Sequence, residues 1–330
     1  LKAVMGAYGD PRQIDGLGGA NPLTSKIAII EPSKYNGCEI DYTFIQAVVG
    51  EDRLDYTPNC GNILAGVGAF AIETGLVRPN NDNTEVSVFM KNSGNRCTLQ
   101  FWTKNGKPIY HGNSEIDGVF GSSAPVMCKY RDLAGSACGR LFPTNSQRDR
   151  FGDIEATCID NGMPVVCIRA KDLEISGNET PQELNKNFKL RQRLEALRIQ
   201  AGFAMGLGDV SSKVIPKMCL VSKPAAGGFI NTRTFIPHQC HDAIGVLGAI
   251  SVASASLFEN SIIQGIANIT LKNVIDLAVE HPSGKIDLQL VTKNQPGMVD
   301  IESASLLRTT RLLARGEVYV PTSIWNGTKD

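Results

Sequence analysis

The sequence predicts an α+β fold, dominated by strands, in which two similar domains each wrap sheet around a central buried helix. The prediction rests on residues 59–75 and 237–258, where a cysteine with polar neighbours precedes a helix-length run of small apolar residues. Neither run reaches the ~18–20 unbroken apolar residues of a membrane span, and a helix that is apolar on every face is normally buried. Because the pattern occurs twice, about 180 residues apart, we expect two similar domains that face each other.

Length and charge narrow the class of protein. A chain of 330 residues is long enough for two domains, and 42% hydrophobic with 20% charged residues is ordinary for a globular protein. Its 33 basic residues balance 33 acidic ones, whereas nucleic-acid binding requires an excess of positive charge. We therefore expect neither nucleic acid nor a membrane as a partner.

The nine cysteines predict reduced thiols rather than a disulfide framework or a metal site. Their number is odd, and no Cys-x-x-Cys or close His/Cys spacing is typical of zinc ligands. The sequence also has no dinucleotide-binding glycine motif after a strand, no phosphate-binding Gly-Lys-Ser/Thr loop and no Gly-x-Ser-x-Gly motif. These observations predict a cytoplasmic protein that works without a metal or a cofactor.

The first half of the chain reads as strands on both sides of the first apolar helix. Asn59 is a good N-cap for that helix, and Gly75 suits the C′ position at its end. The dipeptide Asn105-Gly106 is typical of a hairpin turn, and Gly118–Pro125 reads as a loop between strands. The expected strands cover residues 27–30, 39–49, 52–56, 84–91, 95–103 and 107–113.

The second half contains one conventional surface helix besides the second apolar one. Thr180 is its expected N-cap, Pro181 its first residue, and Glu183 completes a capping box. Its body runs to about Ala204 and carries an apolar stripe opposite its Arg and Lys residues. The stripe consists of Leu190, Leu194, Leu197 and Ala201. The expected strands cover residues 154–159, 163–169, 214–222, 228–236, 275–280, 284–292, 299–307 and 316–320.

Cys60 is the strongest candidate for chemistry. It stands in Asn-Cys-Gly-Asn where the first apolar helix should begin, so we expect it among unpaired amide donors at the positive end of the helix. That position favours a thiolate or a bound carboxylate. The alternative is a packed thiol, which is the expected state of most of the other eight cysteines.

Lys26 is the candidate base. It directly precedes the apolar run 27–30. A lysine at a strand end can simply extend its ammonium to solvent. Near other cations or apolar walls its pKa would fall, and it could then remove a proton from a carbon beside a carbonyl group.

Three further basic residues have a functional and a structural interpretation. Arg233 could bind a substrate carboxylate with two nitrogens, or it could be a solvated strand arginine. Lys217 could face a substrate, or it could mark the start of a strand. His241, next to Cys240, could contact a substrate from the start of the second apolar helix, or it could cap that helix.

The remaining candidates are weaker. His238 lies on the other side of Cys240 and has the same two interpretations as His241. Ser122 and Ser123 offer hydroxyl and backbone donors after Gly121, although a plain turn explains them equally well.

Several motifs, in the same order along nearly the whole chain, resemble the 2-methylaconitate cis-trans isomerase-like family. Within that family they are most similar to the 4-oxalomesaconate tautomerases or isomerases. The motifs are Asp15-Gly-Leu-Gly-Gly, Pro22-Leu-Thr-Ser-Lys26, Asn59-Cys-Gly-Asn62, Thr157-Cys-Ile-Asp-Asn-Gly-Met-Pro-Val-Val166, Gly208-Asp-Val-Ser, Pro216-Lys-Met-Cys219, Asn231-Thr-Arg-Thr-Phe-Ile-Pro-His238 and Glu280-His-Pro-Ser-Gly284.

The resemblance implies a fold similar to that of diaminopimelate epimerase. In that fold two pseudo-symmetric domains each wrap a β-barrel-like sheet around a central buried helix, and the active site lies between them. We expect the first domain to comprise residues 1–142 together with about 303–330, because the last strands should return to it. The second domain would then comprise residues 143–302. The two apolar helices suit this architecture independently.

The resemblance also implies roles for matching residues. Lys26 corresponds to the proton-moving lysine of the family and Cys60 to its active-site cysteine. The residues expected to bind substrate are Ser25, Asn59, Gly61, Asn62, Ser122, Ser123, Lys217, Arg233, His238 and His241. The implied reaction is a proton shift along 4-oxalomesaconate, a small tricarboxylate, in the degradation of gallate, protocatechuate or related aromatic acids. It uses no metal or cofactor, and a homodimer is left open as the assembly.

One difference from the family concerns the start of the chain. Family members begin with Met-Arg-Gly-Gly-Thr-Ser, which would contribute to the first strand and the substrate pocket, whereas this chain begins at Leu1. We therefore expect a leader or a first strand to precede it.

Three other functions compete with this one. Isomerisation of 2-methylaconitate or aconitate would keep Lys26 and Cys60 but change the pocket. Amino-acid epimerisation would need both Cys60 and Cys240 as paired thiols, one at each helix start. A module that binds carboxylates without catalysis would bind tightly and exchange no proton with solvent.

Overall fold

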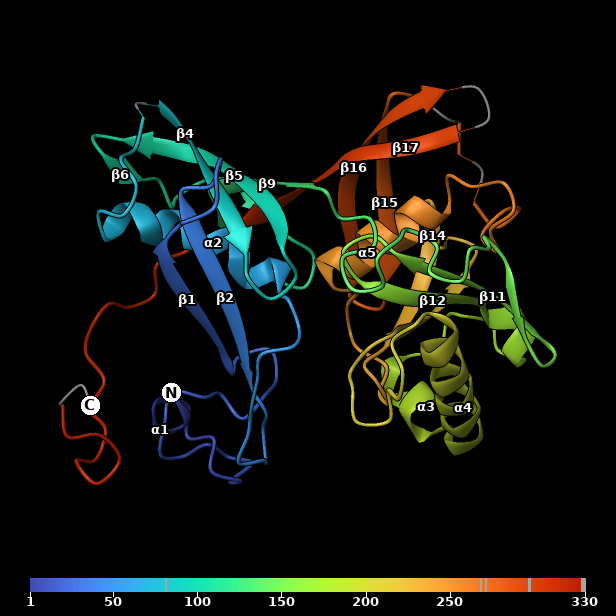
Figure 1. Cartoon of the computed structure of the whole chain (residues 1–330), viewed down its shortest axis with the longest axis horizontal. Helices are drawn as coiled ribbons and strands as arrows, with labels where there is room; N and C mark the ends of the chain where they lie inside the picture. Colours follow the sequence, from blue (N-terminus) through green and yellow to red (C-terminus); the bar gives the residue numbers. More distant parts are fainter. Residues whose placement is uncertain (81, 268, 271, 296–297, 328–330) are drawn as a thin grey trace.

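The computed structural model describes residues 1–80, 82–267, 269–270, 272–295 and 298–327. In this part of the chain fifteen strands join into one sheet, which curls around one helix in each half of the molecule (Figure 1). We call strands β1 to β9 the first half and strands β10 to β16 the second half. The architecture is therefore the strand-rich α+β fold expected from the two apolar helices.

The first half surrounds helix α2 (Gly61–Glu73), which packs against β1, β2, β6 and β9. A short helix, α1 (Lys2–Met5), precedes the first strand. The strands are β1 (Lys26–Pro32), β2 (Ile40–Ala47), β3 (Leu54–Asp55), β4 (Asp82–Met90), β5 (Asn95–Lys104), β6 (Lys107–Pro108) and β9 (Pro125–Arg131), with β7 (Ser114–Glu115) and β8 (Ser122–Ser123) forming a separate ribbon.

The second half surrounds helix α5 (Val246–Ala255), which packs against β11, β12, β15 and β16. Helices α3 (Pro181–Lys186) and α4 (Phe188–Ala204) lie on the outside of this half (Figure 1). The remaining elements are β10 (Asp149–Phe151), β11 (Ile154–Asp160), β12 (Pro164–Arg169), a 3₁₀ turn η1 (Ala170–Leu173), β13 (Lys217–Ser222), β14 (Ile230–Phe235), β15 (Val274–His281) and β16 (Gly284–Gln295).

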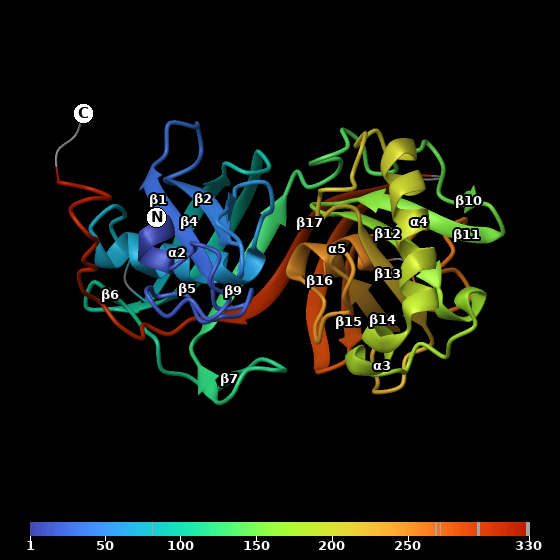
Figure 2. The same cartoon turned by 90° about the horizontal axis from the view of Figure 1, so that it is seen from below.

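Strand β17 (Met298–Thr309) joins the two halves. It pairs antiparallel with β16 up to Leu306 and with β9 from Ser303 to Thr309, so that one strand belongs to both halves. Figure 2 shows β17 passing from the second half toward β9. The proposed domain boundaries at 142 and 303 stay a prediction, and residues 328–330 of the first domain lie outside the described part.

The two central helices differ in how completely the sheet covers them. All ten residues of α5 are buried, whereas Asn62 and Phe70 of α2 are exposed, Phe70 to 51%. A cavity of about 450 Å³ lies along this face of α2 and is lined by Gly66 and Phe70 together with Ala28 of β1 and Leu312. The expectation of sheet on every side therefore holds for α5, while α2 keeps one open face.

Several local predictions are confirmed. Asn105 and Gly106 both have positive φ, as a two-residue hairpin turn requires. Gly75 has φ 77° at the end of α2, where its amide donates to Ile72. Thr180 and Glu183 form the predicted capping box. The stripe along α4 is buried as expected: Leu190, Leu194, Leu197 and Ala201.

Other local predictions are wrong in detail. The N-cap of α2 is Cys60 rather than Asn59. The surface helix is two helices, because Asn187 leaves helical geometry at ψ 85° and its side chain accepts a hydrogen bond from the amide of Leu190, which caps a new helix. Residues 316–320 form no strand, and Tyr319 is 87% exposed with no neighbouring strand paired to this segment in the described part of the chain.

The start of the second apolar helix also differs from the prediction. Helix α5 begins at Val246, and its N-cap is Gly245. Gly245 lies five residues after Cys240, where the helix was expected to begin. Cys240 instead makes an isolated bridge with Phe235, at the end of β14. The polar residues before the apolar run therefore belong to a turn, not to the first turn of the helix.

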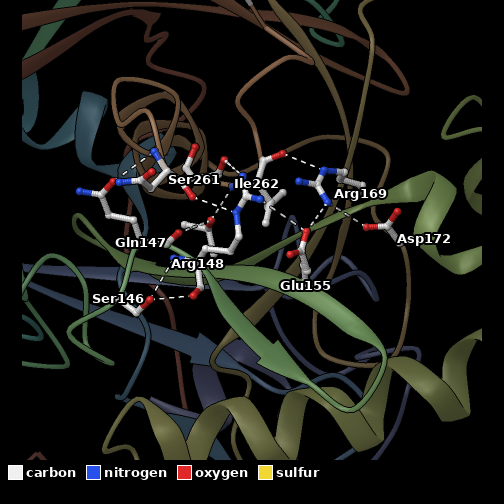
Figure 3. Close-up of polar contacts among 10 residues, drawn as sticks. Ser146, Gln147, Arg148, Glu155, Arg169, Asp172, Ser261 and Ile262 are labelled. Carbon is white, nitrogen blue, oxygen red and sulfur yellow. Dashed lines mark hydrogen bonds and ion pairs between the residues drawn. The ribbon is translucent and has the colours of Figure 1, made fainter.

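Two arginines fix the segment that follows α5 (Figure 3). Arg148 donates to the carbonyl oxygens of Asn260 (3.0 Å) and Ser261 (3.1 Å), and Arg169 donates to that of Ile262 (3.1 Å). Both guanidinium groups also face Glu155, at 3.7 and 2.9 Å. This cluster ties the segment after α5 to β11 and β12.

Candidate active site

The starts of the two central helices meet where the halves join. A Cβ atom placed on Gly61, the first residue of α2, would lie 2.8 Å from Cβ of Val246, the first residue of α5. It would also lie 2.8 Å from the hydroxyl of Tyr130. Only glycine permits this approach, which brings the positive ends of two helix dipoles to one place.

Lys26 and Cys60 lie together at the start of α2. The ammonium of Lys26 donates to Sγ of Cys60 at 3.6 Å, and both side chains are half-buried. The two residues are 34 positions apart in sequence. The structure thus brings together the two residues with the strongest sequence argument for chemistry, one from a strand start and one from a helix N-cap.

Buried hydrogen bonds position the start of β1 and thereby Lys26. The hydroxyl of Ser25, which is wholly buried, donates to Oε1 of Gln13 at 2.6 Å. The side-chain amide of Gln46 donates to the carbonyl oxygen of Ser25 at 2.9 Å, and Gln46 is the β2 partner of Lys26. In this arrangement Ser25 holds the backbone before Lys26.

Cys60 is fixed by its backbone and leaves the helix start uncapped. Its φ and ψ of −137° and 105° are those of an extended N-cap, and its side chain makes no capping hydrogen bond with the first amides of α2. Tyr42 donates to the carbonyl oxygen of Cys60 at 3.0 Å, and burial, followed by the nearby Cys60, raises the pKa of this tyrosine. The side-chain amide of Asn59 donates to Ser93 at 2.7 Å, while its buried Oδ1 accepts from no described residue.

The second half contributes basic groups to the same region. Lys217, at the start of β13, is only 8% exposed, and burial lowers its pKa to about 7, opposed by Asp55 of β3. Burial also lowers the pKa of His241, and the charges of Lys217 and Lys26 lower it further. His241 is thus within electrostatic range of both Lys217 and the lysine of the first half.

Two predicted site residues are held elsewhere in the second half. Arg233 donates to the backbone carbonyl of Glu179 (2.7 Å) and to Asn231 (2.8 Å). His238 is exposed and lies 3.3 Å from the carboxylate of Glu195 on α4. No hydrogen bond or ion pair among the described residues connects either one with the Lys26–Cys60 pair.

Cys240 does not repeat the environment of Cys60. It is 5% exposed and packs in the core between β14 and α3, with Asn185 bonded to its backbone. Burial raises the pKa of its thiol to about 12. The two helix starts therefore do not present a symmetrical pair of thiols.

Ser122 and Ser123 lie in the β7–β8 ribbon, opposite Glu115 and Ser114. The turn of this ribbon reaches the second half, because Asp117 accepts a hydrogen bond from the amide of Lys285 at 2.7 Å. The ribbon projects beside the junction of the halves (Figure 2). In the described part of the chain no contact joins the two serines to Lys26 or Cys60.

Sequence reasoning missed Arg308, which is 7% exposed and donates from Nε to Oδ1 of Asn62 at 3.2 Å. It also missed His281, whose Nδ1 lies 3.2 Å from the hydroxyl of Ser283. His281 stands in the Glu-His-Pro-Ser-Gly motif, which was a usable signal. Arg308 stands at the end of an ordinary strand, and nothing in its local sequence distinguishes it.

Among the described residues, no group of three or more His, Cys, Asp and Glu side chains is arranged to hold a metal ion. In the same part of the chain, no helix has the length and apolar character needed to cross a bilayer.

With the geometry established, comparison with known proteins identifies the family. The sequence profile described as "PrpF protein" matches residues 1–321. The chain belongs to this family. It is 49% identical over 327 residues to a 4-oxalomesaconate tautomerase from Pseudomonas putida, an alignment that covers 99% of this chain and 89% of that protein. It is 45% identical to a (4E)-oxalomesaconate Delta-isomerase from Novosphingobium sp. strain KA1, over 97% of this chain and 88% of that one.

A solved structure agrees with the sequence relatives. The crystal structure of a methylitaconate-delta-isomerase matches this PrpF-family chain with a TM-score of 0.80 and 31% identity, covering 98% of this chain and 88% of that one. The relatives named here are isomerases or tautomerases. The resemblance drawn from the sequence motifs is thereby confirmed.

Proposed function

We propose that this PrpF-family chain is an isomerase that moves a proton along 4-oxalomesaconate, with Lys26 as the base and Cys60 as its partner. The observation that carries the proposal is the 3.6 Å contact between Lys26 Nζ and Cys60 Sγ at the start of α2. The names of the two sequence relatives support the choice of substrate. The substrate is then a small tricarboxylate, while a homodimer and a cytoplasmic location stay predictions.

The proposed reaction is an allylic proton shift. The neutral amine of Lys26 removes a proton from the acidic carbon next to the conjugated system, and the electron pair of the broken C–H bond spreads over that system. The double bond moves, and one proton returns to another carbon or to the keto oxygen, so no atom is gained or lost. Cys60, in contact with the ammonium so formed, either gives its thiol proton to the substrate and is reprotonated by that ammonium, or orients the substrate.

The site is suited to an anionic intermediate. The uncapped amides at the start of α2 and the facing start of α5 provide positive potential without a change in protein conformation. Lys217 and His241 add basic groups from the second half. Preorganised donors of this kind stabilise negative charge as it develops.

The test is proton NMR of 4-oxalomesaconate in heavy water with the wild type, Lys26→Met and Lys34→Met. Wild type should exchange one allylic proton for deuterium and convert the substrate. Lys26→Met should lose about 10²–10⁴-fold in rate, the usual contribution of a general base. Lys34→Met removes an exposed lysine from the loop after β1 and should behave as wild type. Unchanged turnover in Lys26→Met would remove this lysine from the mechanism.

The alternative functions differ in what they require. Isomerisation of 2-methylaconitate or aconitate uses the same pair of residues, so these acids are included in the same NMR experiment. If one of them is converted faster than 4-oxalomesaconate, that acid is the better assignment of the substrate. A two-thiol epimerase needs a reactive Cys240, and the burial of that thiol disfavours it. A module that only binds carboxylates would show no exchange with any of the acids.

A further inference from the structure

Arg308 lies beside the start of α2 on the strand that belongs to both halves. It is only 7% exposed. Its Nε donates to Oδ1 of Asn62, the second residue of α2, at 3.2 Å, and its Nη1 donates to the carbonyl oxygen of Leu307 at 2.7 Å. Nη2 donates to no described residue, and no described carboxylate is within ion-pair distance of the guanidinium. The positive charge of Arg308 is therefore buried without a carboxylate at ion-pair distance in the described part of the chain, although Asp287 attracts it from farther away.

Arg198 shows how this chain neutralises a buried arginine that serves only structure. It is wholly buried, and its Nε and Nη2 donate to the two carboxylate oxygens of Glu195 at 2.7 and 2.8 Å. Further hydrogen bonds go to backbone carbonyls, including that of Val210 at 2.9 Å. A buried charge is stable when it is paired and hydrogen-bonded in this way. Arg308 lacks the carboxylate that Arg198 has.

A second unsatisfied donor lies next to Arg308. Tyr130 is wholly buried, and its hydroxyl has no hydrogen-bond partner among the described residues. This hydroxyl faces Gly61 at the start of α2. Burial raises the pKa of Tyr130, and Arg308 and Cys60 are both close enough to influence it. The hydroxyl thus adjoins the helix start, within electrostatic range of the guanidinium, as a neutral donor without an acceptor among the described residues.

The second half places two titratable groups near Arg308, the carboxylate of Asp287 on β16, which lies beyond ion-pair distance, and the imidazole of His281. The hydroxyl of Ser283 donates to the carbonyl oxygen of Asp242 at 2.7 Å, so Nδ1 of His281, 3.2 Å from that hydroxyl, donates to it. Burial and the charge of Arg308 lower the pKa of His281, whereas Asp117 raises it. His281 is therefore neutral at pH 7 and provides no competing charge for an anion.

We propose that Arg308 binds one carboxylate of the substrate at the start of α2, with Asn62 orienting the guanidinium. This inference rests on the proposed function. Arg308 adjoins the second residue of α2, whereas Cys60 is its N-cap, so the bound carboxylate lies beside the first turn of the helix that begins at Cys60. The carboxylate supplies the close counter-ion that the described residues do not, and the rest of the skeleton is held toward Lys26. Arg308 thereby determines the preference for a polycarboxylate.

The experiment compares two ligands that cannot isomerise. Propane-1,2,3-tricarboxylate has three carboxylates, and pentanedioate has the same chain without the central one. Binding of both is measured by titration calorimetry with the wild type, Arg308→Gln, Arg308→Lys and Arg315→Gln. Arg315 is the control because it is an exposed arginine in the segment after β17. It pairs with Glu73, the last residue of α2. Thermal unfolding of each variant establishes that it is folded.

We expect Arg308→Gln to weaken binding of the tricarboxylate by about 30-fold, because a charge-assisted hydrogen bond is lost. The loss for pentanedioate should be smaller, since it has one carboxylate fewer. Arg308→Lys should recover part of the affinity, because lysine restores the charge without the planar fork. Arg315→Gln should bind as wild type. With 4-oxalomesaconate, Arg308→Gln should raise KM more than it lowers kcat, whereas a merely structural role would lower the unfolding temperature and kcat together.

Wild-type affinity for the tricarboxylate in a folded Arg308→Gln variant would overturn the proposal, as would equal losses for the two ligands or no binding to the wild type. Failure of the proposed function has a different signature. If the wild type binds the tricarboxylate through Arg308 but does not exchange protons of 4-oxalomesaconate, the carboxylate site stands and the substrate assignment fails.

Discussion

The starts of α2 and α5 occupy equivalent places in the two halves, but they differ in chemistry. At the start of α2, Cys60 is the N-cap, is half-buried and contacts Lys26. At the start of α5 the N-cap is Gly245, and Cys240 is packed in the core five residues earlier, with its pKa raised by burial. The repeated architecture thus places the reactive thiol at one helix start, while the other supplies close packing and positive potential.

The two lysines of the site, one from each half, also differ in exposure and in hydrogen bonding. Lys26, in the first half, is half-buried and bonded to a sulfur atom. Lys217, in the second half, is 8% exposed, and its ammonium makes no hydrogen bond with the described residues. A base that exchanges protons with a substrate needs access to it, so Lys26 is the better candidate for proton transfer. Lys217 is better placed to respond to the charge of a bound anion.

Replacing each cysteine with alanine should give the largest difference in activity between the two helix starts. Cys60→Ala should lower kcat/KM for 4-oxalomesaconate by about 10²–10³-fold, because the thiol lies next to the base. Cys240→Ala should stay within about threefold of wild type and lose about 1 kcal/mol of stability, since it removes one buried sulfur atom. Steady-state kinetics and urea unfolding under reducing conditions measure both. Equal losses of activity in the two variants would instead favour the two-thiol mechanism of an epimerase.

Glycine-to-alanine changes compare the packing of the two helix starts. Gly61→Ala places a methyl group 2.8 Å from Cβ of Val246 and from the hydroxyl of Tyr130, so the helices must separate. We expect a loss of about 1–3 kcal/mol in the free energy of unfolding and at least tenfold in activity. Gly248→Ala, within α5, meets only Ile244, at 3.6 Å. It should be neutral or stabilise by up to about 1 kcal/mol, because alanine favours helix. A neutral Gly61→Ala would contradict the close contact.

Much of this architecture could be predicted because its signals are local. The apolar runs, the capping box at Thr180 and Glu183 and the Asn105-Gly106 turn each depend on residues that are neighbours in sequence. The error at α5 shows the limit of this reasoning. A polar stretch before an apolar run predicts that a helix follows, but it does not fix where the first turn begins. The prediction therefore put the start of this helix at Cys240, whereas its N-cap is Gly245.

The site was predictable only in part, because most of it is assembled by long-range contacts. Cys60 carries a local signal, its position before an apolar helix. Arg308 reaches Asn62 across 246 positions of sequence, and Tyr130 becomes significant only because its hydroxyl faces Gly61. Burial likewise lowers the pKa of Lys217, and nothing in the residues around Lys217 shows that it is buried.

The buried lysine of the second half predicts a pH dependence of stability. Burial lowers the pKa of Lys217 from 10.5 to about 7 in the folded protein, with Asp55 opposing and Arg198 adding to the shift. Between these values the unfolded chain binds a proton that the folded protein does not, so this group destabilises the fold increasingly as pH falls from 10.5 to 7. Lys217→Met should therefore stabilise the protein by about 1–3 kcal/mol at pH 7 and by less at pH 10. Denaturant unfolding at the two pH values measures the difference.

The control for this prediction is Lys223→Met, which removes an exposed lysine from the loop after β13. Its effect on stability should be the same at pH 7 and at pH 10. A Lys217→Met variant that is less stable than wild type at pH 7 would show that the ammonium has a stabilising partner. In that case Lys217 would not be the buried, unpaired cation described above.

The smallest expected effect concerns how completely the sheet covers each central helix. Ile250 of α5 is wholly buried, whereas Phe70 of α2 is 51% exposed beside the cavity of about 450 Å³. Ile250→Val should cost about 0.5–1.5 kcal/mol, because it removes a methyl group from a packed core. Phe70→Leu should change the free energy of unfolding by less than about 0.5 kcal/mol, as is usual for exposed positions. Urea unfolding of the two variants measures the contrast. A loss for Phe70→Leu as large as that for Ile250→Val would mean that the open face of α2 is covered in solution.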